Sequence, residues 1–238
     1  SVNDTGSNLG KDDKGLWGGL IILGNAPINS NGGSNADNTP LTNTIEGVPT
    51  TSGISGRSIP ASYAQYGGTN AADDSGVLQY VSIRHGGAEI GSGNEINGLT
   101  LGGVGNGTTI DHIEVFANKD DGIEFFGGTV EVNNAAVAFC GDDAFDYDQG
   151  FSGGGTKWLV IQDQGVGDRG GEFDGDDSPD VTADGMPFAI PTVANWTVIG
   201  RGSNVGNQGL LFRAGSGGHV SNAIIANITS HYCIRIVL

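Results

Sequence analysis

Acidic side chains gather in three clusters that could bind a metal ion or carry acid–base chemistry. Residues 111–184 hold 18 of the 27 carboxylates but only three basic residues, Lys119, Lys157 and Arg169. Carboxylates at this density must be screened, protonated or neutralised by a cation. The three clusters contain Asp120, Asp121 and Glu124; Asp142, Asp143, Asp146 and Asp148; and Glu172, Asp174, Asp176, Asp177 and Asp180.

The first two clusters lie 22 residues apart and would face each other if consecutive segments of chain stack as coils. Equivalent carboxylates would then be about 5 Å apart. Ca²⁺ suits such pairs, because it accepts about six to eight oxygen ligands in a flexible geometry. The expected ligands are all members of the three clusters apart from Asp180. The spacing matches neither an EF-hand loop nor the nine-residue calcium repeat, so solvated turn residues remain the alternative, most evenly at 176–180.

A repeating β architecture must position these clusters. Two series of short β-prone stretches alternate along the chain, and every second residue in them is apolar. The second series starts at intervals of 24, 22, 27, 38 and 24 residues. The first series is 78–83, 110–115, 132–137, 158–161, 193–198 and 220–225, and the second is 98–101, 122–125, 144–147, 171–174, 209–212 and 233–236. This pattern predicts an all-β, right-handed parallel β-helix with coils of about 22–27 residues and long inserted loops.

The whole chain, residues 1–238, is predicted to be a single β-helix domain. Residues 29–68 are rich in Gly, Ser, Thr, Asn and Pro, and we expect them to form a loop excursion packed on the solenoid. Residues 175–191 account for the 38-residue interval and are predicted to be a loop inserted into one coil. Residues 234–238 resemble a strand with no turn after it, so we expect the chain to be a fragment of a longer one.

Several residues test this coil register. Trp158 and Trp196 occupy strand positions where core packing is favoured over a sugar-stacking platform. Cys140 and Cys233 should be roughly 19 Å apart along the axis, beyond the ~7 Å limit for a disulfide, and are predicted to be free thiols. Recurrent asparagines should form either ladders between coils or left-handed turn positions, at Asn133, Asn134, Asn195 and Asn222. An internal aromatic stack is predicted at one register of four coils, from Phe125, Phe145, Phe173 and Phe212.

Composition and charge narrow the class of protein. Of the 238 residues 44 are glycine, more than twice the usual share of roughly 7%, which argues against a helical protein. With 27 acidic and 10 basic residues the net charge is −17, so nucleic acid and anionic membranes are disfavoured as partners. No apolar run approaches the ~20 residues of a membrane helix, which predicts no direct membrane insertion. High ionic strength tolerates such acidity, so we expect an extracellular or outer cell-surface location.

Four glycine-rich motifs carry a resemblance to a known group of proteins. The motifs are residues 15–24 (GLWGGLIILG), 97–105 (NGLTLGGVG), 120–130 (DDGIEFFGGTV) and 141–146 (GDDAFD). Their order resembles a family of uncharacterised, secreted bacterial surface proteins of marine and Bacteroidetes-type bacteria, often labelled lipoprotein or, wrongly, transporter. The resemblance implies a right-handed β-helix and an envelope or extracellular location. It brings no catalytic residues to transfer to this chain.

An enzymatic alternative depends on Asp121, Asp142 and Asp143. Paired Asp residues in adjacent coils resemble the catalytic arrangement of polygalacturonase-type glycosidases, in which one carboxyl acts as acid and others activate water. The His-containing motif expected one coil later is absent, because the equivalent stretch is residues 169–173 (RGGEF). A calcium-dependent lyase with Arg169 or a lysine as base is the other catalytic option. It would need a basic groove, which 10 basic residues among 27 acidic ones do not readily form.

The sequence therefore favours a non-catalytic protein stabilised by Ca²⁺. Its predicted role is structural or adhesive, in a bacterial surface layer or extracellular assembly, because a solenoid supplies stiffness and a repeating face. Self-association or a surface polysaccharide are the candidate partners. Arg169 is expected to form salt bridges with Glu172 and Asp174. Binding or degradation of a polysaccharide through Asp121, Asp142 and Asp143 is the alternative.

Overall fold

The computed structural model describes residues 8–29, 42–45, 48, 60–91, 94–175, 185–202, 208–229 and 232–237. Regular structure in these ranges is almost entirely β-strand, with one short 3-10 helix, η2 (Ala61–Tyr63). In this part of the chain no helix is long and apolar enough to cross a membrane. Two of the predicted calcium ligands, Asp176 and Asp177, lie outside the described residues.

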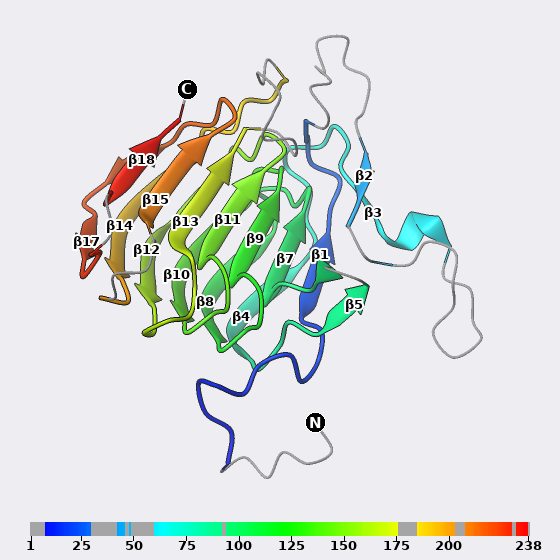
Figure 1. Cartoon of the computed structure of the whole chain (residues 1–238). Coiled ribbons are helices and arrows are strands. Elements are labelled where there is room, and N and C mark those ends of the chain that lie inside the picture. Colours follow the sequence, from blue (N-terminus) through cyan, green and yellow to red (C-terminus); the bar gives the residue numbers. More distant parts are fainter. Residues whose placement is uncertain are drawn as a thin grey trace.

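Seven parallel strands form the first sheet, which runs across the front of the molecule in Figure 1. Their spatial order follows the chain, so each strand pairs with its equivalent in the next coil. The strands are β1 (Leu20–Leu23), β7 (Leu99–Gly102), β9 (Ile123–Phe126), β11 (Phe145–Asp148), β13 (Arg169–Asp174), β15 (Gln208–Arg213) and β18 (Ile234–Ile236).

A second parallel sheet lies behind the first. Its strands are β4 (Val77–Arg84), β8 (Thr109–Phe116), β10 (Glu131–Ala138), β12 (Gly154–Ile161) and β14 (Thr192–Ile199), with β16 (His219–Ser221) and β17 (Ile224–Ala226) both paired to β14. The strands of the two sheets alternate along the chain, so the prediction of a parallel β-helix is confirmed. The winding is right-handed, as in about 98% of parallel crossovers.

A left-handed residue bends every strand of the second sheet at the same register. The φ angle is +54° at Asn134, +59° at Asn195 and +51° at Asn222. Their amides also link coils, because Asn222 Nδ2 donates to Asn195 Oδ1 and Asn134 Nδ2 donates to Asp111 Oδ1. These three asparagines therefore combine the ladder and the turn, which the sequence left as alternatives.

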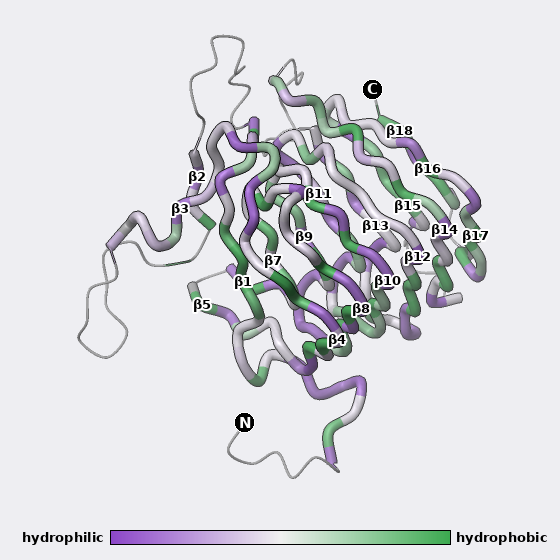
Figure 2. The backbone as a smooth tube through the Cα atoms, turned by 180° about the vertical axis from the view of Figure 1, so that it is seen from behind, coloured by the Kyte–Doolittle hydropathy of each residue, from purple (hydrophilic) through white to green (hydrophobic). Residues whose placement is uncertain are grey.

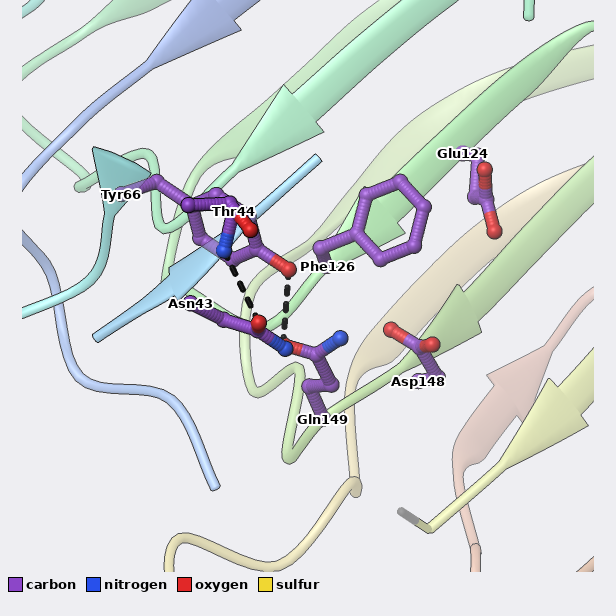
Figure 3. Close-up of a pocket in the computed structure, with 7 residues that line it drawn as sticks. All are labelled: Asn43, Thr44, Tyr66, Glu124, Phe126, Asp148 and Gln149. Carbon is purple, nitrogen blue, oxygen red and sulfur yellow. Dashed lines mark hydrogen bonds between the residues drawn. The ribbon is translucent and has the colours of Figure 1, made fainter. Parts of the chain in front are cut away.

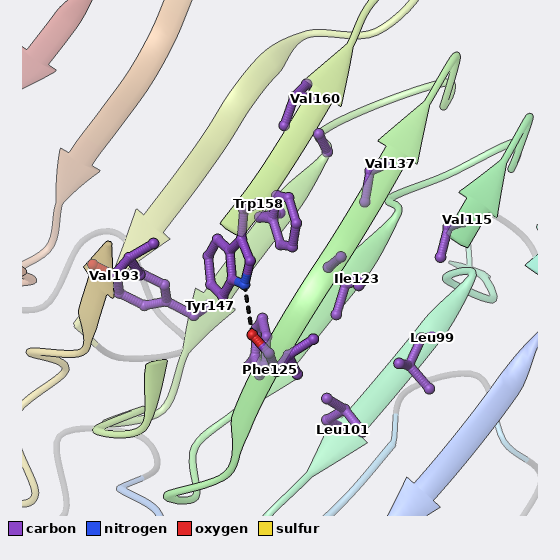
Figure 4. Packing of buried hydrophobic residues seen from close by; sticks show 14 of the residues in the cluster. Leu99, Leu101, Val115, Ile123, Phe125, Val137, Tyr147, Trp158, Val160 and Val193 are labelled. Atoms are coloured by element: carbon purple, nitrogen blue, oxygen red, sulfur yellow. Dashed lines mark hydrogen bonds between the residues drawn. The ribbon is translucent and has the colours of Figure 1, made fainter. Parts of the chain in front are cut away.

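The core lies between the two sheets and is filled by the inward-facing residues of each strand. Figure 4 shows these side chains converging from both sides, with the Trp158 indole N–H donating to the Val132 carbonyl at 2.7 Å. Trp158 and Trp196 are buried, as predicted. Along the backbone in Figure 2, hydrophobic and hydrophilic positions alternate within the strands. This alternation sends every second side chain to the exterior.

The predicted aromatic stack is wrong at one member. Phe125 pairs in register with Tyr147, and Tyr147 with Phe173, which in turn pairs with Phe212. Phe145 lies two residues earlier, beside Ile123. Both Phe145 and Tyr147 face the core because they are two residues apart on one strand, and the smaller distance from the Gly-Asp motif does not decide which one stacks. The rings of Tyr147 and Phe173 are stacked at 4.3 Å.

Part of the predicted loop excursion packs on the outer face of the first sheet. Strands β2 (Asn43–Thr44) and β3 (Gln65–Tyr66) form an antiparallel pair. The buried Tyr66 ring lies over Gly102, where an added Cβ would be 2.7 Å from Tyr66 Cγ. Only glycine at this position lets the ring approach the sheet so closely. A second antiparallel pair, β5 (Glu89–Gly91) and β6 (Asn94–Glu95), lies near the first coil.

The described ends of the predicted 175–191 insertion are joined to the N-terminal segment. The fully buried Asn29 donates through Nδ2 to the carbonyls of Gly175 and Pro187, at 3.0 and 2.8 Å. Residues 176–184 are outside the described residues. The cysteine prediction is confirmed, because Cys140 and Cys233 are both free thiols.

Candidate functional site

Glu124, Asp146 and Glu172 form a row of carboxylates along the outer face of the first sheet, which we call the acidic row. Asp146 pairs in register with Glu124 on one side and with Glu172 on the other. Their chain neighbours, such as Tyr147, point into the core, so alternation sends these carboxylates outward. The sheet therefore brings one member of each predicted acidic cluster into line.

Asp121 and Asp143 precede the row and connect successive coils. Asp121 Oδ1 accepts the backbone N–H of Asp143 at 2.8 Å, and Asp143 Oδ1 accepts the backbone N–H of Arg169. Both Asp side chains are buried, with exposed fractions of 8% and 2%. One oxygen of each carboxylate is thus committed to holding the next coil in place.

Oxygens of the remaining carboxylates approach one another closely. In each of four groups, the ligand atoms all lie within 4.8 Å of one another. The groups are Asp121, Glu124 and Asp146; Asp143, Asp146 and Glu172; Asp120, Asp121 and Asp142; and Asp142, Asp143 and Asp168. The first two share Asp146 and belong to the acidic row, and the other two lie at the turn that precedes it.

Two arginines neutralise the end of the row nearer the C-terminus. Arg169 Nη1 lies 2.9 Å from both Glu172 and Asp168 and 3.3 Å from Asp143. Arg213 contacts Glu172 at 2.8 Å and Asp174 at 2.7 Å. The predicted pair of Arg169 with Glu172 is therefore present, while Arg213 takes Asp174. The sequence gave no signal for Arg213, because its partners lie 39 and 41 residues earlier in the chain.

The other end of the row has no such neutralisation at two of its carboxylates. Among the described residues, no lysine or arginine forms an ion pair with Asp121 or Asp146. Burial raises the pKa of Asp121 well above its ordinary value, and Asp146 raises it further. Burial likewise raises the pKa of Asp146, with a further increase from Glu124. Each carboxylate thus disfavours the ionised form of its neighbours.

The remaining predicted ligands have different surroundings. Asp120 and Asp142 lie at the turn, where burial and then Asp168 raise the pKa of Asp142. Asp174 is bound by Arg213, and Asp148 lies two residues beyond Asp146 on the outer face of the sheet. Asp148 belongs to none of the four close groups among the described residues.

A pocket of about 310 Å³ adjoins the acidic row beneath the β2–β3 pair. Figure 3 shows the Phe126 ring between the Tyr66 side of the pocket and the carboxylates of Glu124 and Asp148. Asn43, Thr44 and Gln149 complete the lining, and the Tyr66 hydroxyl donates to Gln149 Oε1 at 2.9 Å. Sequence reasoning missed this pocket, because Tyr66 and Asn43 belong to the excursion and not to the repeat.

Both the fold and the acidic outer face match one protein family. The model of the pectate-lyase-like β-helix domain matches residues 5–235, almost the whole chain. The chain therefore belongs to the pectate-lyase-like β-helix family. No curated protein and no solved structure matches it.

Proposed function

We propose that this chain is a non-catalytic, calcium-stabilised β-helix with a structural or adhesive role at a bacterial surface or in an extracellular assembly. One observation carries the proposal: Asp121, Glu124 and Asp146 hold carboxylate oxygens from two consecutive coils within 4.8 Å of one another. Such an arrangement of like charges is costly unless a cation lies between them.

Ca²⁺ fits this group of residues better than other common cations. The group offers only carboxylate oxygens, which hard cations prefer, and contains no Cys or His that would favour Zn²⁺. The flexible coordination of Ca²⁺ tolerates ligands set by strand spacing, whereas Mg²⁺ requires a near-ideal octahedron. Since Arg169 occupies the cation position beside Asp143 and Glu172, we expect one ion in the row.

The surroundings of the proposed catalytic residues favour the structural role over an enzyme. Asp143 is 2% exposed, and its two oxygens contact the backbone N–H and the guanidinium of Arg169. Burial alone would lower the pKa of Arg169, but Asp143 and Glu172 outweigh it, so the pKa is raised. A base must release its proton near the working pH, so Arg169 is poorly suited to the lyase reaction.

A surface location and self-association complete the proposal. A net charge of −17 keeps single molecules apart at low salt, while divalent cations can bridge acidic faces. Calcium sites of extracellular modules have dissociation constants of about 10⁻⁴–10⁻³ M, a range that a three-carboxylate site can reach. A surface polysaccharide is the second candidate partner.

The test is thermal unfolding with Ca²⁺ or Mg²⁺ at constant ionic strength, with EDTA as reference. At a Ca²⁺ concentration about 100-fold above Kd the native state gains about 2.7 kcal/mol, which corresponds to a Tm increase of about 5–10 °C. Asp146→Asn should abolish this increase because it removes a ligand without changing the shape of the side chain. Asp12→Asn, at an exposed side chain far from the row, should retain it.

The same preparations distinguish the structural role from the polysaccharide-active alternative, which the family membership favours. Incubation with polygalacturonate and other uronate polymers in Ca²⁺ should release neither reducing ends nor unsaturated products. Cleavage that is lost in Asp143→Asn would establish the enzyme instead. Absence of any Ca²⁺-specific Tm increase would refute the calcium site.

A further inference from the structure

The pocket beside the acidic row has a lining that selects for one kind of ligand. Asp148 pairs in register with Phe126, and Glu124 lies two residues before Phe126 on the same face, so two carboxylates flank one ring. Figure 3 shows both carboxylates on the side of the Phe126 ring away from Tyr66. The ring of Tyr66 lies 6.0 Å from that of Phe126, at 46°.

Hydrogen-bond acceptors dominate the polar part of this lining. Glu124 and Asp148 contribute four carboxylate oxygens, and the side chains of Asn43, Thr44 and Gln149 each offer a further acceptor oxygen. Among the described residues that line the pocket there is no Lys, Arg or His. A ligand that satisfies this surface must be rich in donors and positively charged.

We propose that this pocket binds a guanidinium group. Guanidinium is planar, carries five N–H donors, pairs with carboxylates in a bidentate manner and stacks on aromatic rings. The flanking carboxylates would accept its N–H groups while its plane lies against Phe126. A uronate sugar, in contrast, would bring a negative charge against Glu124 and Asp148. The inference is independent of the calcium site, although Glu124 borders both.

The guanidinium can come from a small molecule or from an arginine side chain. Methylguanidinium is the probe for the first source, and N-acetyl-arginine amide for the second. Arg57 of this chain, which lies outside the described residues, would be a third source, so both probes are also titrated into Arg57→Gln.

Binding is measured by isothermal titration calorimetry or ligand-observed NMR at low ionic strength, in EDTA. N-acetyl-arginine amide should bind about tenfold more tightly than the citrulline amide, which has the same shape but no charge. Asp148→Asn should weaken binding about tenfold, since it removes one charged acceptor. Phe126→Leu should weaken it several-fold through loss of the aromatic face. The matched controls Asp12→Asn and Phe188→Leu, both at exposed side chains, should bind as the parent does.

Each outcome has a defined meaning. Binding seen only in Arg57→Gln supports the proposal and identifies an arginine of the same chain as the competitor. Equal binding of the arginine and citrulline amides overturns it, as does tighter binding of galacturonate, or no binding by the parent and Arg57→Gln alike. The calcium titration of Asp148→Asn separates the two sites: a retained Tm increase with lost probe binding assigns Asp148 to the pocket alone.

Discussion

At the scale of single residues, the same carboxylate group does three different jobs within a few ångströms. Asp121 and Asp143 accept backbone N–H groups of the following coil and fix the stacking of the turns. Asp174 accepts two donors from Arg213. Asp146, by contrast, faces other carboxylates from both neighbouring strands. Surroundings rather than residue type therefore decide which carboxylates are free to hold an ion.

The raised pKa values lead to a prediction for stability in the absence of Ca²⁺. Burial and neighbouring carboxylates raise the pKa of Asp121, Asp143 and Asp146 above the unfolded value of about 3.9. Between that value and the raised pKa the folded state binds more protons, so the free energy of unfolding must fall as pH rises. In EDTA we expect Tm to decrease from pH 5 to pH 8.

Asp146→Asn should flatten this decrease and should raise Tm at pH 8, because it removes a charge that has no favourable partner. Saturating Ca²⁺ should flatten it in the parent protein, since the ion stabilises the ionised carboxylates. Asp12→Asn serves as the control for a general change in charge. A Tm that rises between pH 5 and pH 8 in EDTA would contradict the assignment.

The sequence was sufficient to predict which residues the row would contain, because coil spacing alone brings Glu124, Asp146 and Glu172 together. It was insufficient to predict their neutralisation. Arg213 reaches Glu172 only because a long insertion separates their coils in sequence but not in space. The contact between Asn97 Nδ2 and Glu124 is of the same kind.

At the scale of elements, the coil is defined by where the chain bends. The alternation of apolar residues predicts the strands closely: β8 (Thr109–Phe116) and β10 (Glu131–Ala138) each extend the predicted stretch by one residue at either end. The bend within each of these strands was predicted only where asparagine marks it. His112 and Lys157 adopt the same left-handed conformation, with φ of +54° and +61°, and neither residue type signals a turn.

This bend can be tested at Asn134. Its φ of +54° is tolerated by Asn and Gly, but a β-branched side chain there should cost about 1–2 kcal/mol, in addition to the lost hydrogen bond to Asp111. We expect Asn134→Val to lower the free energy of unfolding by about 2–3 kcal/mol in urea titrations, and Asn134→Gly to lower it by about 1 kcal/mol.

The matched control is Ala136→Val, which places the same side chain two residues further along β10 at a position without positive φ. It should change stability by less than about 0.5 kcal/mol. If Asn134→Val is no worse than Ala136→Val, the bend does not constrain the coil.

The β2–β3 pair shows what a repeat cannot predict. Its register and position depend on a few specific contacts, such as Tyr66 over Gly102, and not on a pattern that recurs. The same applies to Phe145, since a period locates a strand but not which of two core-facing aromatics will stack with the next coil. Elements outside the repeat also form the pocket, which explains why the sequence did not indicate it.

At the scale of the whole molecule, a slender apolar core is enclosed by a strongly acidic exterior. The net charge of −17 has two separable physical consequences. General self-repulsion acts between exposed charges and weakens with ionic strength. Local repulsion in the acidic row acts between buried or half-buried carboxylates, where salt screens much less. High-salt adaptation depends on the first consequence, and calcium binding on the second.

Titration with NaCl and Ca²⁺ together should separate these two effects. The Debye length falls from about 30 Å at 0.01 M to about 4–5 Å at 0.5 M, so NaCl over this range should raise Tm without any requirement for a specific ion. Because the row is poorly accessible to monovalent ions, most of the Ca²⁺-induced increase should persist at 0.5 M NaCl. In the double variant Asp12→Asn/Glu131→Gln, at two exposed positions, the NaCl-induced increase should shrink while the Ca²⁺-induced increase stays the same. In Asp146→Asn the opposite pattern is expected. A Ca²⁺ effect that disappears at 0.5 M NaCl would mean that screening of the surface, and not an ion held between coils, explains the acidity of this β-helix.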